Sequence, residues 1–410
     1  MTELQTRQCD VAVVGAGMVG AATSLALAQQ GFRVIQIEVH EPQSGFDAAV
    51  IDNRVSALTR ASQNLLENLG VWSAMQGMRV TPYSDMHVWD AGGKGVIHFD
   101  AADIAEPCLG HIVENHVTQL ALWQAISAHD NIEIICPDKV VQLKREAGQS
   151  VLQLASGGEV RAGLVVAADG RQSAMRDLLG IGTHGWPYDQ HALVATVTTA
   201  AGHADTAWQR FLPNGPLAYL PLHDNYSSIV WSTTPEQAAE LKQLPDDQFC
   251  TALTQASETR LGEVTSVQAR AIFPLELKHA DTYISEGFVL IGDAAHAVHP
   301  LAGQGVNLGF LDVASLVDVL LQVRQQGREL GGLHSLRRYE RSRKGSNMGM
   351  LAAMDGFKRL FGSQLLPVKL ARNAGLSIAD VFSPLKNFLV SYAMGLQGDL
   401  PPLVRPRFHT

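Results

Sequence analysis

The sequence predicts an α/β protein with α+β elements, and three observations support this fold class. A short apolar strand, a glycine-rich loop and a helix follow one another near the N-terminus, an order typical of a Rossmann-like domain. Residues 184–273 alternate threonine, valine and aromatic residues between turn signals, which favours a mainly antiparallel sheet. From residue 331 onward the apolar spacing is helical, so we expect a helical C-terminal region.

The first strand, at residues 11–14, leads into glycines with G-x-G-x-x-G spacing. Gly15 allows a tight turn, Gly17 allows the backbone to approach a pyrophosphate, and Gly20 allows close packing of helix on strand. The helix at 21–30 offers the free N–H groups of its first turn, near Met18, to the phosphates. This context predicts a dinucleotide-binding loop rather than a simple tight turn.

A second strand, at residues 33–37, ends at Glu38. This acidic residue follows the last glycine by 18 positions, where a carboxylate can accept hydrogen bonds from ribose hydroxyl groups.

The elements that follow are predicted from periodicity and turn signals. Helical spacing joins Leu58, Leu65, Leu66 and Leu69 before Gly70. We expect a hairpin over 83–99 with its turn at Gly92-Gly93, a helix capped by Asn115 or Thr118, a strand at 132–135 and three antiparallel strands over 140–166.

Two further turns come directly after predicted buried strands, and each contains an aspartate and a glycine. They are Asp169-Gly170 and Gly292-Asp293. Because parallel strands end at a common edge of their sheet, we expect both turns to lie beside the first glycine loop, where ligands of such sheets bind. The alternative interpretation is that both aspartates only form turns.

The second half of the chain combines a sheet with helices. Two helices, 235–241 and 246–261, interrupt the antiparallel sheet, and a long helix is expected over 306–325. Helices with breaks at Pro367, Gly375 and Pro384 are expected over 337–396.

These elements predict two interleaved domains and a C-terminal region. The nucleotide-binding domain comprises residues 1–82, 114–183 and 276–330; the substrate domain comprises the hairpin 83–113 and the sheet 184–275; the helical region and tail comprise 331–410.

Composition restricts the class of protein. The chain has 410 residues, 46% of them hydrophobic, and a net charge of −9, which argues against general nucleic-acid binding. Its four cysteines have no C-x-x-C spacing, so neither a disulfide framework nor a metal site is expected. The first residues lack the apolar core of a signal peptide, which favours a cytoplasmic location.

Charge is unevenly distributed along the chain. From residue 331 onward there are twelve Lys and Arg against four Asp and Glu, giving +8, so the first 330 residues carry −17. Basic residues among apolar ones are typical of helices that rest on a membrane surface, and this suggests peripheral contact at the inner face of a membrane. The five that carry this hypothesis are Lys358, Arg359, Lys369, Arg372 and Lys386; the alternative is a solvated basic face.

The three turns, in this order, resemble those of the class A FAD-dependent aromatic hydroxylases, the para-hydroxybenzoate hydroxylase-like monooxygenases. Arg54-Val-Ser-Ala-Leu, Gly215-Pro-Leu-Ala-Tyr-Leu-Pro-Leu and the run from Gly292 to Gly309 are similar to the ubiquinone-biosynthesis hydroxylases. Within that subfamily, the chain most resembles the 2-polyprenyl-3-methyl-6-methoxy-1,4-benzoquinol hydroxylases. The resemblance covers residues 10–396 and leaves 397–410 as an extra tail.

The resemblance implies a set of site residues. FAD would be bound by Gly15, Gly17, Met18, Gly20, Glu38, Arg54, Gln119, Asp169, Gly170, Gly292, Asp293, Gly305, Val306 and Asn307. Among the expected catalytic residues, Gly303, Gln304 and Gly305 would stabilise negative charge on reduced flavin through the N–H groups of a helix N-terminus, and Pro300 would rigidify their loop. A surface salt bridge remains the alternative for Arg54, a surface position for Gln119 and a structural role for His296.

Aromatic and apolar residues of the sheet are candidates for the substrate pocket, with core packing as the alternative for each. They are Trp208, Phe211, Tyr219, Leu220, Trp231 and Phe273. The apolar stretch 217–222 and the scarcity of arginine around it favour a lipid-tailed substrate over a small charged acid.

The implied activity is ring hydroxylation of a polyprenylated benzoquinol or phenol in ubiquinone biosynthesis, with FAD as cofactor and NAD(P)H and O₂ as co-substrates. In this scheme oxygen adds at the flavin 4a-carbon as a hydroperoxide and passes to an electron-rich ring. Alternatives are an FAD oxidase or dehydrogenase acting on another apolar substrate, and a catalytically quiet flavoprotein subunit of a biosynthetic complex.

Overall fold

The computed structural model describes residues 6–43, 45–91, 95–297, 305–362, 386–387, 390–391 and 394–406. For residues 350–355 and 357–362 only the backbone is described.

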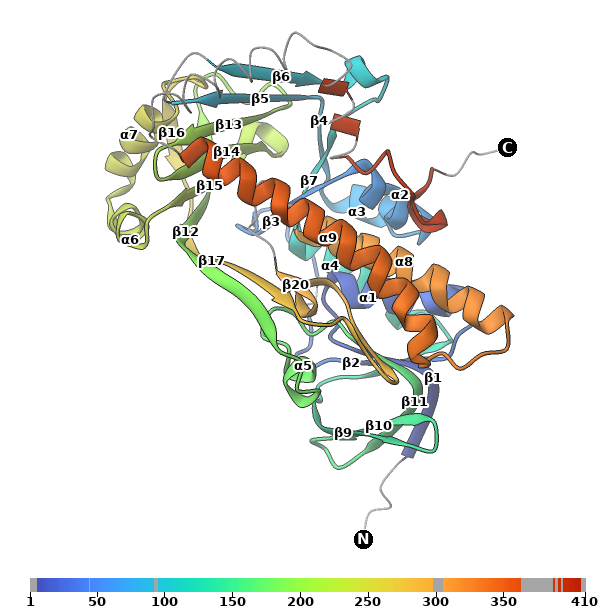
Figure 1. The fold of residues 1–410 in the computed structure, drawn as a ribbon. Helices are drawn as coiled ribbons and strands as arrows, with labels where there is room; N and C mark the ends of the chain where they lie inside the picture. Colours follow the sequence, from blue (N-terminus) through green and yellow to red (C-terminus); the bar gives the residue numbers. More distant parts are fainter. Residues whose placement is uncertain are drawn as a thin grey trace.

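A parallel sheet forms the base of the molecule (Figure 1). Its strands, in spatial order, are β18 (Ile284–Ser285), β19 (Phe288–Leu290), β11 (Glu159–Ala167), β1 (Thr6–Val14), β2 (Val34–Ile37) and β8 (Ile132–Ile135). The strands from β19 to β8 are parallel, and β18 is antiparallel to β19. The predicted antiparallel excursion is confirmed, because β9 (Val140–Glu146) and β10 (Gln149–Leu154) form a hairpin that pairs with β11.

The three turns predicted to share one edge do so. Strands β19, β11 and β1 are neighbours, and the glycine loop, Asp169-Gly170 and Gly292-Asp293 directly follow their carboxyl ends. The order of the strands therefore brings together segments separated by more than 270 positions.

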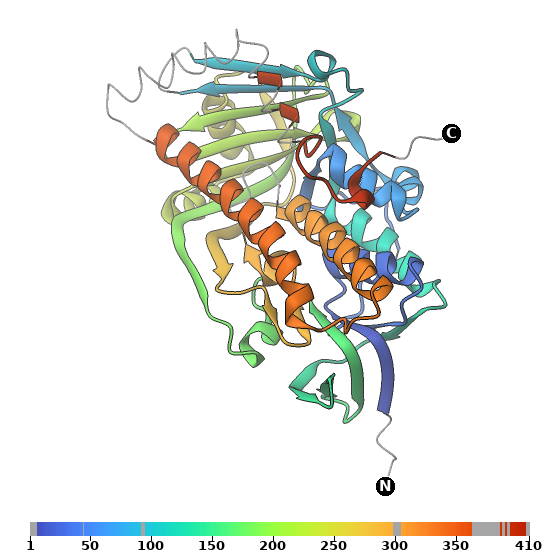
Figure 2. The same ribbon diagram turned by 45° about the vertical axis from the view of Figure 1, so that its right-hand side comes forward.

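Helices cover this sheet. They are α1 (Met18–Gln29), α4 (Asn115–Ser127), α5 (Ala174–Leu178), α8 (Gly305–Gln325) and α9 (Leu333–Gly362). Helix α8 packs between α1 and α9 and is long and apolar enough to span a membrane, yet 72% of its most apolar window is buried inside the protein, as in a core helix. Figure 2 shows α9 running from the parallel sheet to the second sheet.

The second sheet is mainly antiparallel, as predicted. Its order is β20 (His296–Ala297), β17 (Ala271–Ala280), β12 (Thr183–Thr199), β15 (Tyr226–Thr233), β14 (Gly215–Pro221), β13 (Thr206–Leu212), β5 (Asp85–Asp90) and β6 (Val96–Asp100), with β16 (Val264–Val267) beside β12. Only β13 and β5 pair in parallel among the described strands of this sheet. The hairpin β5–β6 confirms the predicted hairpin, and the turn at Gly92-Gly93 lies outside the described residues.

A three-stranded sheet joins the two larger ones. It consists of β3 (Val55–Leu58), β7 (Gly110–Glu114) and β4 (Thr81–Tyr83). Along the chain, α2 (Arg60–Asn68) and α3 (Trp72–Met78) lie between β3 and β4, and the 3-10 turn η1 (Ala101–Ile104) precedes β7. Helices α6 (Pro235–Gln243) and α7 (Asp246–Ala256) lie against the second sheet. Short 3-10 turns complete the fold: η2 (His223–Asn225), η3 (Gly292–Ala294) and η5 (Pro402–Val404).

Three local predictions were wrong. Leu58 ends strand β3, and helix α2 begins two residues later because the side chain of Thr59 accepts a hydrogen bond from the Ser62 amide as its N-cap. Neither Asn115 nor Thr118 caps α4, whose N-cap is Glu114. Helix α7 ends at Ala256 instead of residue 261.

The segment 397–410 is the extra tail expected from the resemblance, and its position in the fold was not predicted. Its described part packs against helix α2, where Val404 is fully buried, and the side-chain amide of Asn64 donates to the Val404 carbonyl at 3.0 Å. The predicted breaks at Pro367, Gly375 and Pro384 lie outside the described residues.

Candidate functional site

The glycine loop between β1 and α1 is tightly packed on one side and open on the other. A Cβ atom on Gly15 would lie 2.5 Å from the Ala168 carbonyl oxygen, and one on Gly20 would lie 1.9 Å from the Gly15 carbonyl oxygen. A Cβ on Gly17, the N-cap of α1, would meet no protein atom within 4 Å. The loop thus presents open backbone at the helix N-terminus, the surface that an anionic pyrophosphate requires.

Glu38 connects this loop to the end of β2. Its Oε2 accepts a hydrogen bond from the Ala16 amide, and its Oε1 accepts from the Val39 and His40 amides at 2.8 and 3.1 Å. A carboxylate has about four lone-pair positions, so Glu38 can order the loop and still accept from a ribose hydroxyl group.

Asp169 faces the start of helix α5. Its Oδ1 accepts from the Ser173 hydroxyl at 2.5 Å and its Oδ2 from the Met175 amide at 3.0 Å. Burial raises the pKa of Asp169, and these hydrogen bonds oppose the rise. Asp169 therefore fixes the turn. A Cβ placed on Gly170, where φ is +82°, would meet no protein atom within 4 Å, so the adjacent space is open.

Two helix N-termini meet at the Gly292-Asp293 turn. Val19, in the first turn of α1, lies 3.2 Å from a Cβ placed on Gly292 and 2.5 Å from one placed on Gly309 in α8. Gly309 thus allows α8 to approach α1 closely. Because both helices begin here, at Met18 and Gly305, the positive ends of their dipoles reinforce each other and favour an anionic ligand.

The Asp293 side chain is exposed to solvent, although the neighbouring residues of its turn are buried. Burial raises its pKa, and the electrostatic effects of His296, Arg171 and Arg54 oppose the rise. No hydrogen bond from the described residues reaches this carboxylate, so it is free to bind a ligand. The Arg54 guanidinium carbon lies 6.0 Å from the ring centre of Phe273, so these two predicted site residues lie next to each other.

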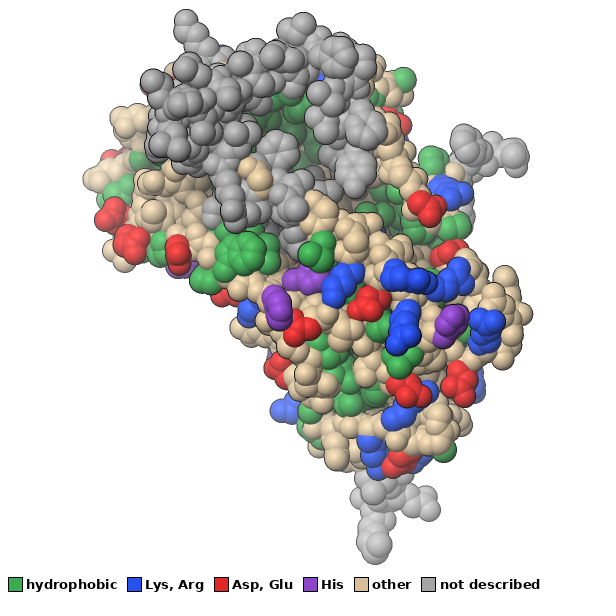
Figure 3. Space-filling view, viewed as in Figure 1, with side chains coloured by type: hydrophobic (Ala, Val, Ile, Leu, Met, Phe, Trp, Pro, Cys, Tyr) green, Lys and Arg blue, Asp and Glu red, His purple; other side chains and the backbone are tan. Residues whose placement is uncertain are grey.

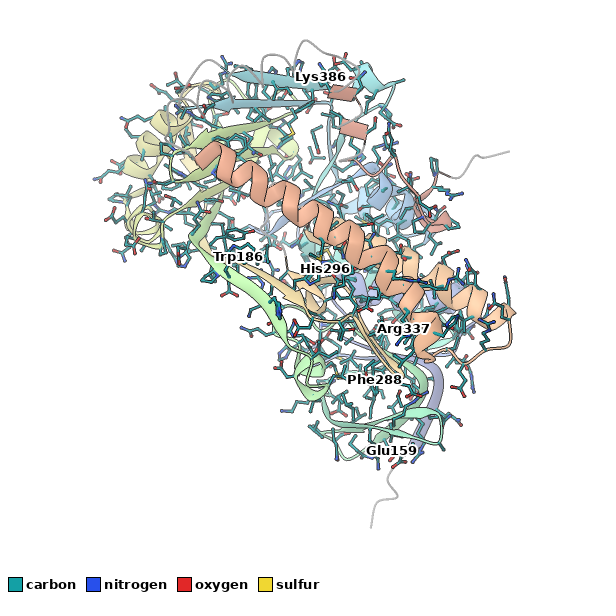
Figure 4. The ribbon with its side chains drawn as sticks, in the orientation of Figure 1. Glu159, Trp186, Phe288, His296, Arg337 and Lys386 are labelled. Atoms are coloured by element: carbon teal, nitrogen blue, oxygen red, sulfur yellow. The ribbon has the colours of Figure 1, made fainter. Side chains whose placement is uncertain are left out.

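A buried ionic network supports the turn from below. The Asp312 carboxylate accepts three hydrogen bonds: from the Gly292 amide (3.0 Å), from His296 Nε2 (2.5 Å) and from Arg343 Nε (2.7 Å). Burial would raise the pKa of Asp312, but His296 and Arg343 outweigh it and lower the pKa to about 2. His296 therefore has a structural role beneath α9, where Figure 4 labels it.

A second buried ion pair holds the loop before Arg54. Arg79 Nη1 donates to Glu114 Oε1 at 2.8 Å, both side chains are buried, and Glu114 Oε2 accepts from the Asp52 amide at 2.6 Å. Arg79 also donates to the Ala48 carbonyl at 2.6 Å. This pair fixes the backbone from which Arg54 projects.

The start of α8 is tied to strand β3. Asn307 donates to the Ala57 carbonyl at 2.8 Å and accepts from the Ser62 hydroxyl at 2.6 Å, so its side chain is engaged within the protein. Gly305 and Val306 begin the helix, where backbone N–H groups lack intrahelical partners. Pro300, Gly303 and Gln304 lie outside the described residues, and Gln119 is half-buried on α4 beside α1.

An apolar cavity of about 40 Å³ lies next to this junction, between the three-stranded sheet and the second sheet. Its apolar lining comprises Ala57, Met86, Ile112, Ala207, Ala218 and Leu220. Because Ala57 lines the cavity and also receives the hydrogen bond from Asn307, the cavity adjoins the first turn of α8.

The structure divides the predicted substrate residues into two groups. Leu220 lines the cavity, and Phe273 lies beside Arg54. Trp208 borders the cavity, but its side chain packs against the core on the opposite face of the sheet. Tyr219 and Trp231 belong to the core that the sheet shares with Phe249 and Leu253 of α7, on the opposite face. Phe211 is half-buried on the same strand as Trp208 and does not line the cavity.

Sequence reasoning missed Arg79, Glu114, Asp312 and Arg343. One signal was available, because Asp312 is an acid inside the apolar run of α8, where a buried charge requires a partner. Arg343 gave no such signal, since Arg341 and Lys344 beside it have the same character and lie nearer the surface.

The structure combines an open nucleotide loop at the edge of a parallel sheet with an apolar cavity beneath an antiparallel sheet. This is the arrangement of FAD-dependent monooxygenases. Residues 8–352 match the family described as FAD binding domain. The chain belongs to this family and, within it, to the hydroxylases of ubiquinone biosynthesis.

Relatives and solved structures agree with this assignment. The chain is 42% identical to the 3-demethoxyubiquinol 3-hydroxylase of Escherichia coli, over 94% of this chain and 98% of the relative. It is 36% identical to the ubiquinone hydroxylase UbiL of Rhodospirillum rubrum, over 94% and 89%. The p-nitrophenol 4-monooxygenase PnpA of Pseudomonas putida has the same fold, with a TM-score of 0.76, 19% identity and coverage of 95% and 98%.

Proposed function

We propose that this protein hydroxylates the ring of a polyprenylated benzoquinol, with FAD as cofactor and NAD(P)H and O₂ as co-substrates. The observation that carries the proposal is the apolar cavity that adjoins the start of α8, since no described Lys, Arg or His lines it. An apolar cavity favours a neutral, lipid-tailed ring over a carboxylated one.

The described residues fit FAD. Gly15, Gly17 and Gly20 would hold the pyrophosphate, Glu38 the ribose, and Asp293 the ribityl hydroxyl groups. When bound, FAD supplies the redox and oxygen chemistry. The protein positions one edge of the ring at the cavity, excludes water and places the N-terminus of α8 where negative charge is stabilised.

Replacement of Asp293 by alanine should weaken FAD binding by about 1.5–3 kcal/mol, the contribution of a hydrogen bond to a charged group. The carboxylate is free among the described residues, so the loss should leave the fold intact. The FAD dissociation constant measures the effect, and Asp130→Ala, at an aspartate before β8 and remote from the glycine loop, is the control. Equal affinity in both variants would leave Asp293 as a turn former.

Cells that lack the protein should accumulate a ubiquinone precursor short of one ring hydroxyl group, as the name of the Escherichia coli relative suggests. Mass spectrometry of quinones in the deletion strain identifies the intermediate, and ¹⁸O₂ should label the ring of the rescued product. Normal ubiquinone in a strain without a redundant hydroxylase would reject the proposal. Stoichiometric peroxide without ring label would indicate an oxidase instead.

We also propose that the protein contacts a membrane surface, from which a lipid-tailed substrate must be collected. Figure 3 shows basic side chains gathered over the first half of α9, where Arg337, Arg338 and Arg341 are exposed. Lys386, one of the residues first expected to carry this contact, instead pairs with Asp103 at 2.9 Å. The side chains of Lys358, Arg359, Lys369 and Arg372 lie outside the described residues.

The protein should sediment with anionic vesicles at low salt, and glutamine at Arg337, Arg338 and Arg341 should reduce the bound fraction several-fold. Glutamine at the exposed Arg260, on the α7 side of the second sheet, is the control. Failure of the wild type to bind would show that the basic face is only solvated.

A further inference from the structure

Gln209 is a buried polar residue in the otherwise apolar cavity. It lies on β13, 8% of its surface is exposed, and no described residue forms a hydrogen bond with its side-chain amide. The next residue along the strand, Arg210, points the other way and donates to the Ala256 carbonyl and to Glu258. The strand therefore turns its cation away from the cavity and its neutral amide toward it.

Tyr83 contributes a second polar group from strand β4, on the other side of the cavity. Its hydroxyl group has no hydrogen-bond partner among the described residues, and it lies 3.1 Å from a Cβ placed on Gly110. Burial raises the pKa of Tyr83 above its ordinary value of 10, so the hydroxyl group stays neutral and can donate a hydrogen bond.

Two unpaired polar groups inside an apolar cavity are unfavourable unless a ligand or water pairs with them. The volume of about 40 Å³ exceeds that of one water molecule and suits a small substituent rather than a whole ring. No described side chain that lines the cavity carries a charge, so the substituent must be neutral.

We propose that Gln209 and Tyr83 determine substrate specificity by donating hydrogen bonds to the oxygen atom of a methoxy substituent on the ring. This inference rests on the proposed function and specifies the substrate as a ring with an oxygenated edge that enters the cavity. A buried amide and hydroxyl group left unpaired by an alkyl substituent discriminate against rings with an alkyl group in place of the methoxy group.

The test compares two benzoquinols with the same short prenyl tail, one with a methoxy group and one with a methyl group on the ring. The wild type should prefer the methoxy compound. Gln209→Met, which keeps chain length, and Tyr83→Phe should each lower kcat/KM for it about 3–10-fold and leave that of the methyl compound unchanged. Tyr226→Phe, at a half-buried tyrosine that packs against the core formed by Ala57, Ala207 and Leu220 but does not line the cavity, is the matched control.

The outcomes distinguish failure of the proposed function from failure of the specificity assignment. If the wild type oxidises NAD(P)H with neither compound and hydroxylates neither, the proposed function fails. If the wild type hydroxylates both and the variants affect both equally or not at all, the specificity assignment is overturned.

A gain of binding gives an independent result, since misfolding cannot produce it. Gln209→Arg should allow a prenylated ring with a carboxylate substituent to perturb the flavin absorbance, which the wild type should not permit. No spectral change with any concentration of that acid, in a variant that retains FAD, would contradict the assignment.

Discussion

Protein with valine in place of Gly17 should purify folded and colourless. The site of the new side chain is free of protein atoms within 4 Å, and φ is −64°, so valine meets no steric obstacle in the protein itself. It would occupy the space that a pyrophosphate needs at the N-terminus of α1. We expect at least ~100-fold weaker FAD binding, about 2.7 kcal/mol, measured as flavin per protein chain.

Two comparison variants make this result specific. Gly77→Val, at an exposed glycine of α3 with equally open surroundings, should retain full FAD content. Gly20→Val should fail to fold, since its Cβ would meet backbone at 1.9 Å. Full flavin occupancy in Gly17→Val would mean that no pyrophosphate lies against this loop.

Replacement of Arg343 by methionine should lower the free energy of unfolding by about 3–5 kcal/mol. The variant leaves the carboxylate of Asp312 fully buried without its arginine partner, and breaking a buried pair from one side has this cost. Thermal unfolding followed by circular dichroism measures the loss. Arg341→Met, two residues earlier and exposed, should change stability little; equal loss in both would assign the effect to α9 rather than to the ion pair.

The same network predicts how stability depends on pH. The pKa of Asp312 is lowered in the folded state from 3.8 to about 2, so its contribution is present above about pH 4 and is lost as the pH falls from about 4 toward 2. Without Arg343, the pKa of Asp312 should rise, and acid unfolding should begin at a higher pH than in the wild type.

The nucleotide loop could be predicted because the residues that determine its structure are close together in the sequence. A strand, three glycines at fixed spacing and a helix lie within thirty residues, and the rule that parallel strands end at one edge then placed Asp169 and Gly292 beside them. The structure confirms that placement, and the roles of these residues toward FAD remain predictions.

The faces of the second sheet could not be predicted in the same way. Tyr219 and Leu220 are adjacent on β14 and point to opposite faces. Alternation identifies an inner face only when the other face is polar, and here α7 covers one side while the three-stranded sheet covers the other. Apolar residues on both faces therefore left Tyr219 and Trp231 indistinguishable from residues that line the cavity.

Contacts between segments far apart in the sequence could not be predicted either. Asn307 joins Ala57 across 250 positions, and Arg343 reaches Asp312 from another helix. No local pattern in the sequence contains such a pair.

The packing of residues 394–406 on α2 has a consequence for the order of events during synthesis. Asn64 pairs with a carbonyl 340 positions later, and Asn68 pairs with carbonyls of the same segment at 2.8 and 3.1 Å. While the ribosome is still adding residues, the surface of α2 that this segment covers has no occupant, and its apolar atoms face water. Closure of the domain must wait until residues 394–406 have been synthesised, and contacts of such long range form slowly. Until residues 394–406 dock, α2 exposes the surface that they cover in the folded protein, and exposed apolar surface of this kind promotes aggregation.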